Sequence, residues 1–352
     1  MKVGNVKIGT DHVYVIAEAG VNHNGDIELA KKLIDAAKNA SADAIKFQTF
    51  TTDEIVTDKA TQAAYQSENT GIVESQASML RRLELSHEAF AALKKYAAER
   101  NIEFLSTPFS FIDADFLHSI DLSAYKVSSG DLTNHPFLKH LAQFKKPVLI
   151  STGMSTLEET QDAYATLKNA DAEVIVMQCT SEYPTPQDHA NLRVIETFKK
   201  TFDTPIGYSD HTTEIDTCVY AASLGASVVE KHFTLDRNLP GPDQKASLEP
   251  HELTQMILEI REGKMAARDV PEHILGSGEK EPTKDEVVTA KLVRKGIAAR
   301  IDIGSGETLS ESNVFIARPE GLIPPKDWAR VLGRRAKRDI PKGTPLAWDM
   351  IA

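Results

Sequence analysis

The sequence lacks several features that define familiar classes of protein. Only two of its 352 residues are cysteines, Cys179 and Cys218, and no Cys-x-x-Cys spacing occurs, so neither a disulfide framework nor a zinc module is predicted. No apolar run approaches the roughly 20 residues needed to cross a bilayer, and the first residues contain no apolar signal segment. These absences favour a cytoplasmic protein without a membrane partner.

Basic residues are also in short supply. The 51 aspartates and glutamates outnumber the 40 lysines and arginines, which gives a formal net charge of −11. An acidic chain repels the phosphate backbone, so a nucleic-acid partner is not expected. An anionic substrate would need a local basic pocket.

The sequence is rich in short apolar runs that alternate with segments of helical periodicity. Eight such runs occur, at residues 13–20, 42–50, 102–109, 124–130, 147–153, 173–180, 205–210 and 227–234. Eight strand–helix units over about 255 residues predict an α/β fold of the TIM (β/α)8 barrel type, with the strands parallel and covered by helices. A doubly wound open sheet is the alternative. A dinucleotide-binding sheet of that kind would have a glycine-rich turn after the first strand, and Ala19-Gly-Val-Asn-His-Asn-Gly25 is not one.

Two stretches interrupt this alternation. Residues 51–85 are polar and too long for an ordinary connection, so we interpret them as an active-site loop or lid. Residues 269–283 are rich in proline, glycine and charge, which predicts a linker. The predicted barrel therefore spans residues 1–268, and the short apolar runs and tight turns of residues 284–352 predict a small β-rich domain.

Polar side chains gather where the predicted strands end. The carboxyl ends of the strands carry the active site in a parallel barrel, so we expect a site at that face. The residues at or just after the strand ends are Glu18, Lys46, Gln48, Thr107, Lys126, Ser129, Asp131, Ser151, Thr180, Ser181, Tyr183, Ser209, Asp210, His211, Glu230 and His232, and Asp243 follows in the turn after the last strand.

Two histidines follow adjacent predicted strands and form a candidate metal pair. Imidazole groups such as those of His211 and His232 bind Mn²⁺, Fe²⁺, Co²⁺ or Zn²⁺, with water and carboxylate oxygens completing an open site. A pair of hydrogen-bonded structural histidines is the alternative.

Two lysines, Lys46 and Lys126, interrupt strands that are otherwise apolar. A buried ammonium group needs a partner, so these lysines either form structural ion pairs or bind a phosphate or carboxylate together with nearby hydroxyl groups. A third interpretation is that one of these lysines forms a Schiff base with a carbonyl substrate. The acidic side chains of the mouth are general acid–base candidates or simply the partners of the lysines.

Taken in order, the motifs resemble those of the bacterial sialic acid synthase family, and the C-terminal segment resembles the antifreeze-like (SAF) module of that family. The motifs are Ile16-Ala-Glu-Ala-Gly-Val-Asn-His-Asn-Gly25, Lys46-Phe-Gln48, Ser106-Thr-Pro-Phe109, Ser128-Ser-Gly130, Ser151-Thr-Gly-Met154, Glu182-Tyr-Pro-Thr-Pro186, Gly207-Tyr-Ser-Asp-His211, Glu230-Lys-His-Phe-Thr234 and Gly241-Pro-Asp243. The chain departs from the family at Arg318-Pro-Glu-Gly-Leu322, where the family has Arg-Pro-Gly-Asn-Gly.

The resemblance implies a metal-dependent N-acetylneuraminate synthase. Such an enzyme condenses phosphoenolpyruvate with N-acetylmannosamine to a nine-carbon 2-keto-3-deoxy acid and releases phosphate by C–O cleavage. The close alternative is an N,N'-diacetyllegionaminate synthase that uses 2,4-diacetamido-2,4,6-trideoxymannose. A non-catalytic sugar-binding protein is a remote alternative, which would predict a degraded barrel mouth.

The resemblance also assigns roles to individual residues. It implies that His211 and His232 hold a divalent metal, with Mn²⁺ expected and Mg²⁺ or Co²⁺ as alternatives. The implied phosphoenolpyruvate site consists of Lys46, Thr107, Lys126, Ser129, Ser151 and Ser209, the implied sugar site consists of Gln48, Tyr183, Asp243 and Arg318, and the catalytic groups are Glu18, Asp131, Lys46 and Lys126. The family further implies a domain-swapped homodimer, in which Arg318 reaches the sugar from the partner chain.

Overall fold

The computed structural model describes residues 1–9, 11–263 and 269–352. Its centre is a parallel eight-stranded sheet with the order β5-β4-β3-β10-β9-β8-β7-β6, and β5 lies beside β6, so the sheet closes into a barrel. The strands are β3 (Tyr14–Gly20), β4 (Ala44–Thr49), β5 (Glu103–Pro108), β6 (Tyr125–Val127), β7 (Val148–Ser151), β8 (Val174–Cys179), β9 (Ile206–Asp210) and β10 (Val228–His232). The predicted (β/α)8 barrel is confirmed, and all eight predicted strands are present.

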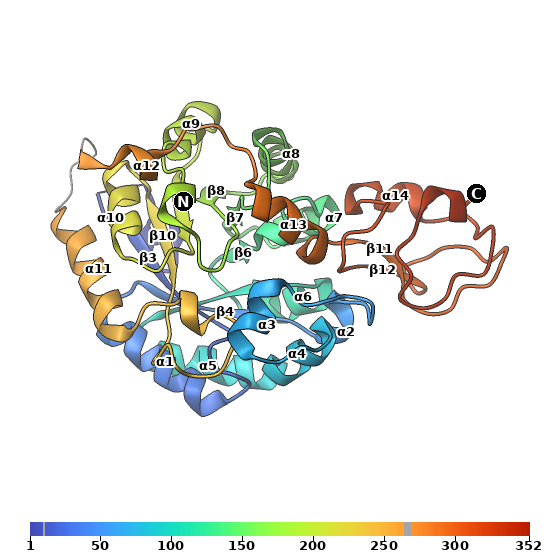
Figure 1. Cartoon of the computed structure of the whole chain (residues 1–352), viewed down its shortest axis with the longest axis horizontal. Coiled ribbons are helices and arrows are strands. Elements are labelled where there is room, and N and C mark those ends of the chain that lie inside the picture. The colour runs from blue at the N-terminus through green and yellow to red at the C-terminus, as the bar shows by residue number, and fades with distance from the viewer. Residues whose placement is uncertain (10, 264–268) are drawn as a thin grey trace.

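Helices surround the barrel, as Figure 1 shows. Those that cover its strands are α1 (Ile27–Asn39), α5 (His87–Glu99), α6 (Phe111–Ser119), α7 (His135–Ala142), α8 (Leu157–Lys168), α9 (Val194–Thr201), α10 (Asp216–Ser223) and α11 (Pro250–Glu262). Asp26 caps the first of these helices, since its carboxylate accepts from the N–H groups of Glu28 and Leu29. The last helix was predicted to continue to Ala267, and residues 264–267 lie outside the described part of the chain.

The barrel interior is built in layers because side chains alternate along each strand. The inward-facing residues nearest the carboxyl ends are polar. Two positions earlier on the same strands the inward residues are apolar, and they form one buried cluster that includes Ile16, Ala44, Leu105, Ala124, Leu149 and Val228. This apolar layer is the floor of the polar site above it.

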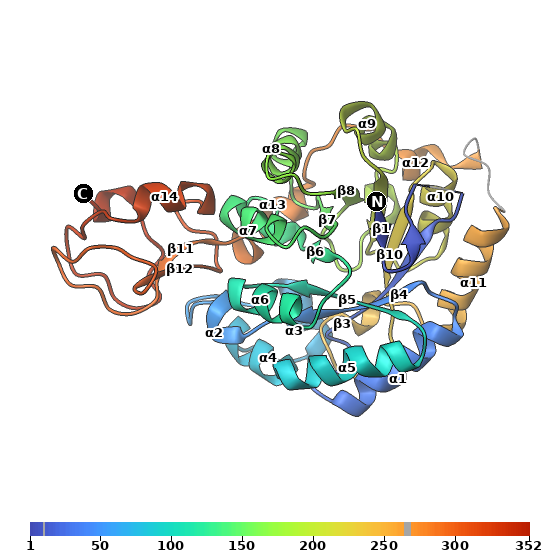
Figure 2. The same ribbon diagram turned by 180° about the vertical axis from the view of Figure 1, so that it is seen from behind.

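The amino-terminal end of the barrel is closed by a hairpin that the strand pattern did not predict. Strands β1 (Lys2–Val3) and β2 (Val6–Lys7) pair antiparallel, and they lie beside the barrel strands in Figure 2. Val3 and Ile8 are 1% and 4% exposed and pack in the same cluster as the apolar layer. The hairpin therefore seals the bottom of the barrel.

Residues 51–85 are not an irregular loop. They contain three short helices, α2 (Thr52–Ile55), α3 (Ala64–Thr70) and α4 (Gln76–Leu83). Buried residues of this segment, among them Ile55, Met79 and Leu80, form a small core with Phe50 and Phe109 at the barrel mouth. A segment over the site, as predicted, is compatible with this structure. The interpretation of residues 51–85 as a loop was wrong, because the segment contains three helices.

The C-terminal part begins with helices rather than with a plain linker. Helix α12 (Glu272–Leu275) lies inside the predicted linker, and α13 (Lys284–Val293) separates the barrel from a small domain that extends to one side in Figures 1 and 2. That domain contains β11 (Gly296–Ala299) paired antiparallel with β12 (Val314–Ala317), followed by α14 (Trp328–Val331). It has its own buried core. The short 3-10 turns within the described residues include η1 (Ser129–Asp131), η2 (Gln187–His189), η3 (Gln244–Ala246), η5 (Pro325–Asp327) and η6 (Trp348–Met350). Among the described helices, none combines the length and apolar character needed to span a membrane.

Candidate active site

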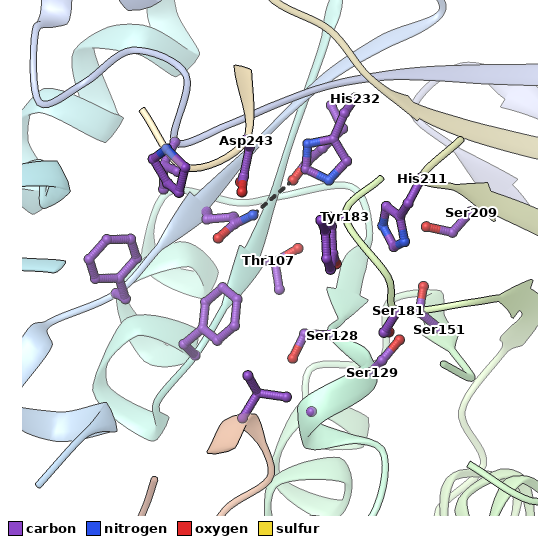
Figure 3. A pocket seen from close by; sticks show the side chains of 18 of the residues that line it. Thr107, Ser128, Ser129, Ser151, Ser181, Tyr183, Ser209, His211, His232 and Asp243 are labelled. Atoms are coloured by element: carbon purple, nitrogen blue, oxygen red, sulfur yellow. Dashed lines mark hydrogen bonds between the residues drawn. The ribbon is translucent and has the colours of Figure 1, made fainter. Parts of the chain in front are cut away.

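A pocket opens at the carboxyl ends of the barrel strands, between the segment with α3 and α4 and the helix α13. Almost all of the residues predicted for the site line it (Figure 3). They are Glu18, Lys46, Gln48, Thr107, Lys126, Ser129, Ser151, Tyr183, Ser209, His211, His232, Asp243 and Arg318. Glu230 lines the pocket as well, whereas Asp131 and Asp210 do not.

The floor of the pocket carries two lysines and two glutamates of alternating charge. Lys46 Nζ lies 2.7 Å from Glu18 Oε2 and 3.6 Å from Glu230 Oε1, and Lys126 Nζ lies 3.1 Å from the same Glu230 oxygen. All four side chains are at most 5% exposed. Because Glu18 and Glu230 pair with the lysines, both ammonium groups are held at the bottom of the pocket, where their position is suited to an anionic ligand.

The two glutamates of this group differ in acidity. Burial and, to a smaller extent, the neighbouring carboxylate of Glu230 raise the pKa of Glu18 to about 7, against the opposing effect of Lys46. Burial alone would raise the pKa of Glu230 as well, but Lys126 and Lys46 outweigh it and lower that pKa to about 2. Glu18 can therefore exchange a proton near neutral pH, whereas Glu230 remains an anion.

The predicted catalytic residue Asp131 lies outside the pocket. It belongs to η1, is 1% exposed and accepts from Lys295 Nζ at 2.8 Å and from Asn134 Nδ2 at 3.0 Å. Lys295 belongs to the C-terminal part of the chain, so this ion pair joins the two domains. Of the two predicted catalytic carboxylates, Glu18 faces the pocket and Asp131 is a structural partner.

The two predicted metal ligands lie next to each other at the mouth. The rings of His211 and His232 are 5.3 Å apart, and both are beside Tyr183 in Figure 3. His211 Nδ1 lies 2.6 Å from the carbonyl oxygen of Thr180, so it carries the proton and leaves Nε2 as the free lone pair. Burial lowers the pKa of His232 well below its usual value, which keeps this ring neutral, and its Nδ1 has no hydrogen-bond partner among the described residues.

These features fit a divalent metal ion held by two imidazoles. No group of three or more histidine, cysteine or acidic side chains suited to a metal occurs in the described ranges. Water and substrate oxygens would thus occupy the remaining coordination positions of such an ion, as in an open catalytic site.

The positions of the two histidines are set by a buried ion pair between their chain neighbours. Lys231 Nζ lies 2.5 Å from Asp210 Oδ2, and both side chains are 0% exposed. Asp210 also accepts from Tyr208 and Thr217, and Lys231 donates to two carbonyl oxygens of the turn after β9. Asp210, one of the acidic side chains that end the predicted strands, is therefore structural.

Hydroxyl groups line the side of the pocket opposite Asp243 (Figure 3). Thr107 accepts from Lys46 Nζ at 3.0 Å, and Ser209 donates to Glu230 at 3.1 Å. The hydroxyl oxygens of Ser151 and Ser181 are buried and have no partner within the described part of the chain. Buried polar atoms are nearly always hydrogen-bonded, so unpaired hydroxyls beside two lysines indicate a place for a polar, anionic ligand.

The opposite side of the pocket is aromatic and amphipathic. Tyr65 of α3 stacks on Tyr183 with ring centroids 5.0 Å apart, and Gln48 Nε2 lies 3.3 Å from Glu18 Oε1. Burial raises the pKa of Asp243 to about 6. Amide, carboxylate and aromatic groups of this kind are suited to the hydroxyl and N-acyl groups of a sugar.

Arg318 reaches the pocket from the C-terminal domain of its own chain. The backbone of Arg318 bonds to Ile55 and Thr57 of the mouth segment, with N–H···O distances of 2.9 Å in both directions. Its guanidinium lies over the ring of Phe109, 5.4 Å from the centroid. The resemblance implies that this arginine reaches the sugar site of a partner chain. Within the single chain described, β12 packs against α2, and the exchange between two chains stays a prediction.

Several lining residues were not among the predicted site residues. Tyr65 lies in the long polar segment. The sequence showed no helical periodicity there, so the direction of its side chain could not be predicted. Ser128 and Cys179 also line the pocket and stand at strand ends, so their position after an apolar run could have identified them. Ser181 was predicted as a strand-end residue without a role. Glu230 was predicted as a candidate acid or as an ion-pair partner of the lysines, and the structure places it between Lys46 and Lys126.

The fold and the pocket are typical of a barrel enzyme whose site combines a floor with two buried lysines, a pair of histidines suited to a metal ion and a polar wall. A family model described as the NeuB family matches residues 33–271, and a SAF domain model matches residues 294–352. The chain therefore belongs to the NeuB family.

Named relatives and a solved structure agree with this assignment. The chain is 40% identical to the N,N'-diacetyllegionaminic acid synthase of Legionella pneumophila over 96% of this chain and 94% of that one. It is 42% identical to the enzyme of the same name from Campylobacter jejuni, over 92% of this chain and 96% of that one. The crystal structure of the spore coat polysaccharide biosynthesis protein SpsE of Bacillus subtilis superposes with a TM-score of 0.85 at 34% identity, covering 100% of this chain and 99% of that one.

Proposed function

We propose that the chain is an N,N'-diacetyllegionaminate synthase, which condenses phosphoenolpyruvate with 2,4-diacetamido-2,4,6-trideoxymannose. The broader class is that of the nonulosonic acid synthases that use phosphoenolpyruvate. Two relatives at 40% and 42% identity are named for the legionaminic product, which favours this sugar over the N-acetylmannosamine that we predicted first from the sequence.

The observation that carries the proposal is the composition of the pocket floor. Lys46, Lys126 and the unpaired hydroxyls of Ser151 and Ser181 supply donors for an anion with several oxygens. Phosphoenolpyruvate carries both a phosphate and a carboxylate, which two cations and a set of hydroxyls can bind together. The sugar then lies against Tyr183, Gln48, Asp243 and Arg318.

The chain's own residues account for the chemistry. The C3 carbon of phosphoenolpyruvate forms a bond to the aldehyde carbon of the open-chain sugar, and the aldehyde oxygen gains a proton. Positive charge develops at C2, where a water adds and gives up a proton to Glu18. The C2–O bond to phosphate then breaks, its electron pair leaves with the phosphate, and the proton of the new C2 hydroxyl passes to the departing phosphate, which leaves the 2-keto group. The lysines hold the phosphate through both steps, and the low-dielectric pocket strengthens their effect.

A divalent ion, Mn²⁺ by preference, would be held by His211 and His232. When bound, such an ion supplies Lewis-acid polarisation of the sugar carbonyl. We also propose a cytoplasmic location, which the two free cysteines support. The homodimer implied by the sequence stays a proposal, and the swapped exchange of C-terminal domains stays a prediction.

The proposal is tested by phosphate release. The chain is incubated with phosphoenolpyruvate, Mn²⁺ and either 2,4-diacetamido-2,4,6-trideoxymannose or N-acetylmannosamine, and products are identified by mass spectrometry. We expect faster release with the diacetamido sugar, loss of release on chelation and recovery on adding Mn²⁺. A preference for N-acetylmannosamine would favour an N-acetylneuraminate synthase, and no release with either sugar would contradict both readings.

A further inference from the structure

The segment between the two family matches is anchored to the active site. Residues 272–293 lie outside both matched regions, and α13 lies between the barrel and the C-terminal domain (Figure 1). Two charged side chains of this segment are nevertheless buried, with Lys280 4% and Glu286 1% exposed. Burying charge is unfavourable unless each group is fully paired, so their partners indicate what the segment does.

Glu286 joins the turns that follow two adjacent barrel strands. Its Oε1 atom accepts from the backbone N–H groups of Met154 and Ser181, both at 2.6 Å. Its Oε2 atom accepts from the N–H of Thr283 at 3.0 Å. Thr283 is the N-cap residue of α13, so this hydrogen bond is part of the helix cap. Hydrogen bonds to an ionised carboxylate are stronger than neutral ones. A single side chain therefore ties the turns after β7 and β8 to the start of the helix.

Lys280 binds the same strand end from the other side. Its Nζ donates to the carbonyl oxygen of Cys179 at 3.1 Å, and its own carbonyl oxygen accepts from the N–H of Leu157 at 3.0 Å. Together with Glu286, it fixes the carbonyl of Cys179 and the N–H of Ser181. These two groups flank one residue, Thr180.

Thr180 is the residue that orients a candidate metal ligand. Its carbonyl oxygen accepts the proton of His211 Nδ1 at 2.6 Å, and Figure 3 shows Ser181 and His211 on the same side of the pocket. The ring orientation of His211 thus depends on a peptide carbonyl whose two neighbours are both held by the connecting segment.

We propose that Lys280 and Glu286 are positioning residues of the metal site: they hold the end of β8 so that the Thr180 carbonyl keeps His211 Nε2 directed at the pocket. The activity part of this inference rests on the proposed function, whereas the metal-binding part does not. A segment that only connected two domains would have no use for two buried charges bonded to the peptides on either side of Thr180.

The experiment compares near-isosteric variants of the full chain. Glu286→Gln removes the charge and leaves an N–H₂ group facing the Thr283 N–H, and Lys280→Met removes the donor to Cys179. Glu281→Gln and Lys284→Met are matched controls, because both residues are exposed and belong to the same segment. Mn²⁺ affinity without substrate is measured by calorimetric titration and by the EPR signal of free Mn²⁺, and melting is followed by circular dichroism.

Changes to groups that orient a metal ligand weaken metal binding or activity by about 10- to 100-fold. We expect a loss of Mn²⁺ affinity in that range for Glu286→Gln and Lys280→Met, and affinities within about twofold of the wild type for the two controls. Raising Mn²⁺ should restore the kcat of both variants with little change in the KM for the sugar.

Two results would overturn the inference. One is wild-type Mn²⁺ affinity in both variants, with or without a lower melting temperature, since that is what a purely structural segment predicts. The other is a wild-type chain that binds no Mn²⁺. A wild-type chain that binds Mn²⁺ but releases no phosphate with any sugar would contradict the proposed function and leave this inference standing.

Discussion

At the scale of single residues, Glu18 is the group whose protonation changes near neutral pH. Its pKa of about 7 means that the carboxylate form increases as the pH rises from 6 to 8. If Glu18 accepts the proton of the attacking water, kcat/KM should rise with pH across this range and level off above pH 8. A pH profile of phosphate release measures this.

The matched variants separate Glu18 from its neighbours. Glu18→Gln should lower kcat by about 10²- to 10⁴-fold and remove the inflection near pH 7. Asp243→Asn, which removes a group of pKa about 6, should leave that inflection in place. An unchanged profile in Glu18→Gln would show that another group is the base.

The buried pair Lys231–Asp210 carries a prediction about stability. Lys231→Met leaves the Asp210 carboxylate buried without its cation, and breaking a buried pair in this way destabilises a protein by about 3 to 5 kcal/mol. Urea unfolding monitored by circular dichroism measures the change. The double variant Lys231→Met with Asp210→Asn should recover part of the loss, because it removes both charges. A single variant as stable as the wild type would show that the pair is unimportant.

Most of the site residues could be predicted because they stand at strand ends. Glu18, Lys46 and Lys126 interrupt apolar strands at the positions that face inward, so periodicity alone places them together. Asp131 could not be assigned in the same way. It follows β6 at the same end of the barrel, but its partner Lys295 lies 164 residues later, and only the packing of the two domains shows that this carboxylate is already paired.

At the scale of elements, the short helices of residues 52–83 form one wall of the pocket. Tyr65 of α3 stacks on Tyr183, which in turn contacts His211 with ring centroids 4.2 Å apart. Aromatic pairs contribute about 0.5–1.5 kcal/mol beyond burial. Tyr65→Ala should therefore raise the KM for the sugar by about 2- to 10-fold.

A conservative variant tests the stacking explanation. Tyr65→Phe keeps the ring and should retain a KM close to that of the wild type, as measured by steady-state phosphate release at saturating phosphoenolpyruvate. An equal rise in both variants would assign the effect to the hydroxyl group, and no rise in either would exclude Tyr65 from sugar binding.

The strands were easier to predict than the segments around them. Each barrel strand is a buried apolar run, so its composition identifies it. Helices α2 to α4 are only four to eight residues long and bury residues against the barrel mouth rather than along a regular stripe. The hairpin β1–β2 has two residues per strand, which is too short for any alternation to appear.

At the scale of the whole molecule, the C-terminal domain completes the pocket of its own chain. Arg318, Arg300 and Lys295 all contact the barrel, the last two through ion pairs with Glu54 and Asp131. The sequence identifies this domain by its turns and by its family resemblance. It does not show which part of the barrel the domain contacts, because the contacts join residues more than 160 positions apart.

Complementation distinguishes this arrangement from a domain swap. His211→Ala and Arg318→Ala are co-expressed with two different tags, and doubly tagged material is assayed for phosphate release. If Arg318 stays with its own barrel, the mixed dimer should have no activity above that of the separate variants, because no site then has both residues. Recovery to about half of wild-type activity, from one intact site of two, would establish exchange of Arg318 between chains. Co-expression of each variant with the wild type is the control.

The sealed bottom of the barrel has a consequence for the order of turnover. Since Val3 and Ile8 close one end together with the apolar layer, both substrates and both products must use the same entrance. The site proposed for phosphoenolpyruvate is the deeper one, so a sugar bound above it would block its exit. We therefore expect phosphoenolpyruvate to bind first and phosphate to leave last, which makes inorganic phosphate a competitive inhibitor against phosphoenolpyruvate and a non-competitive inhibitor against the sugar.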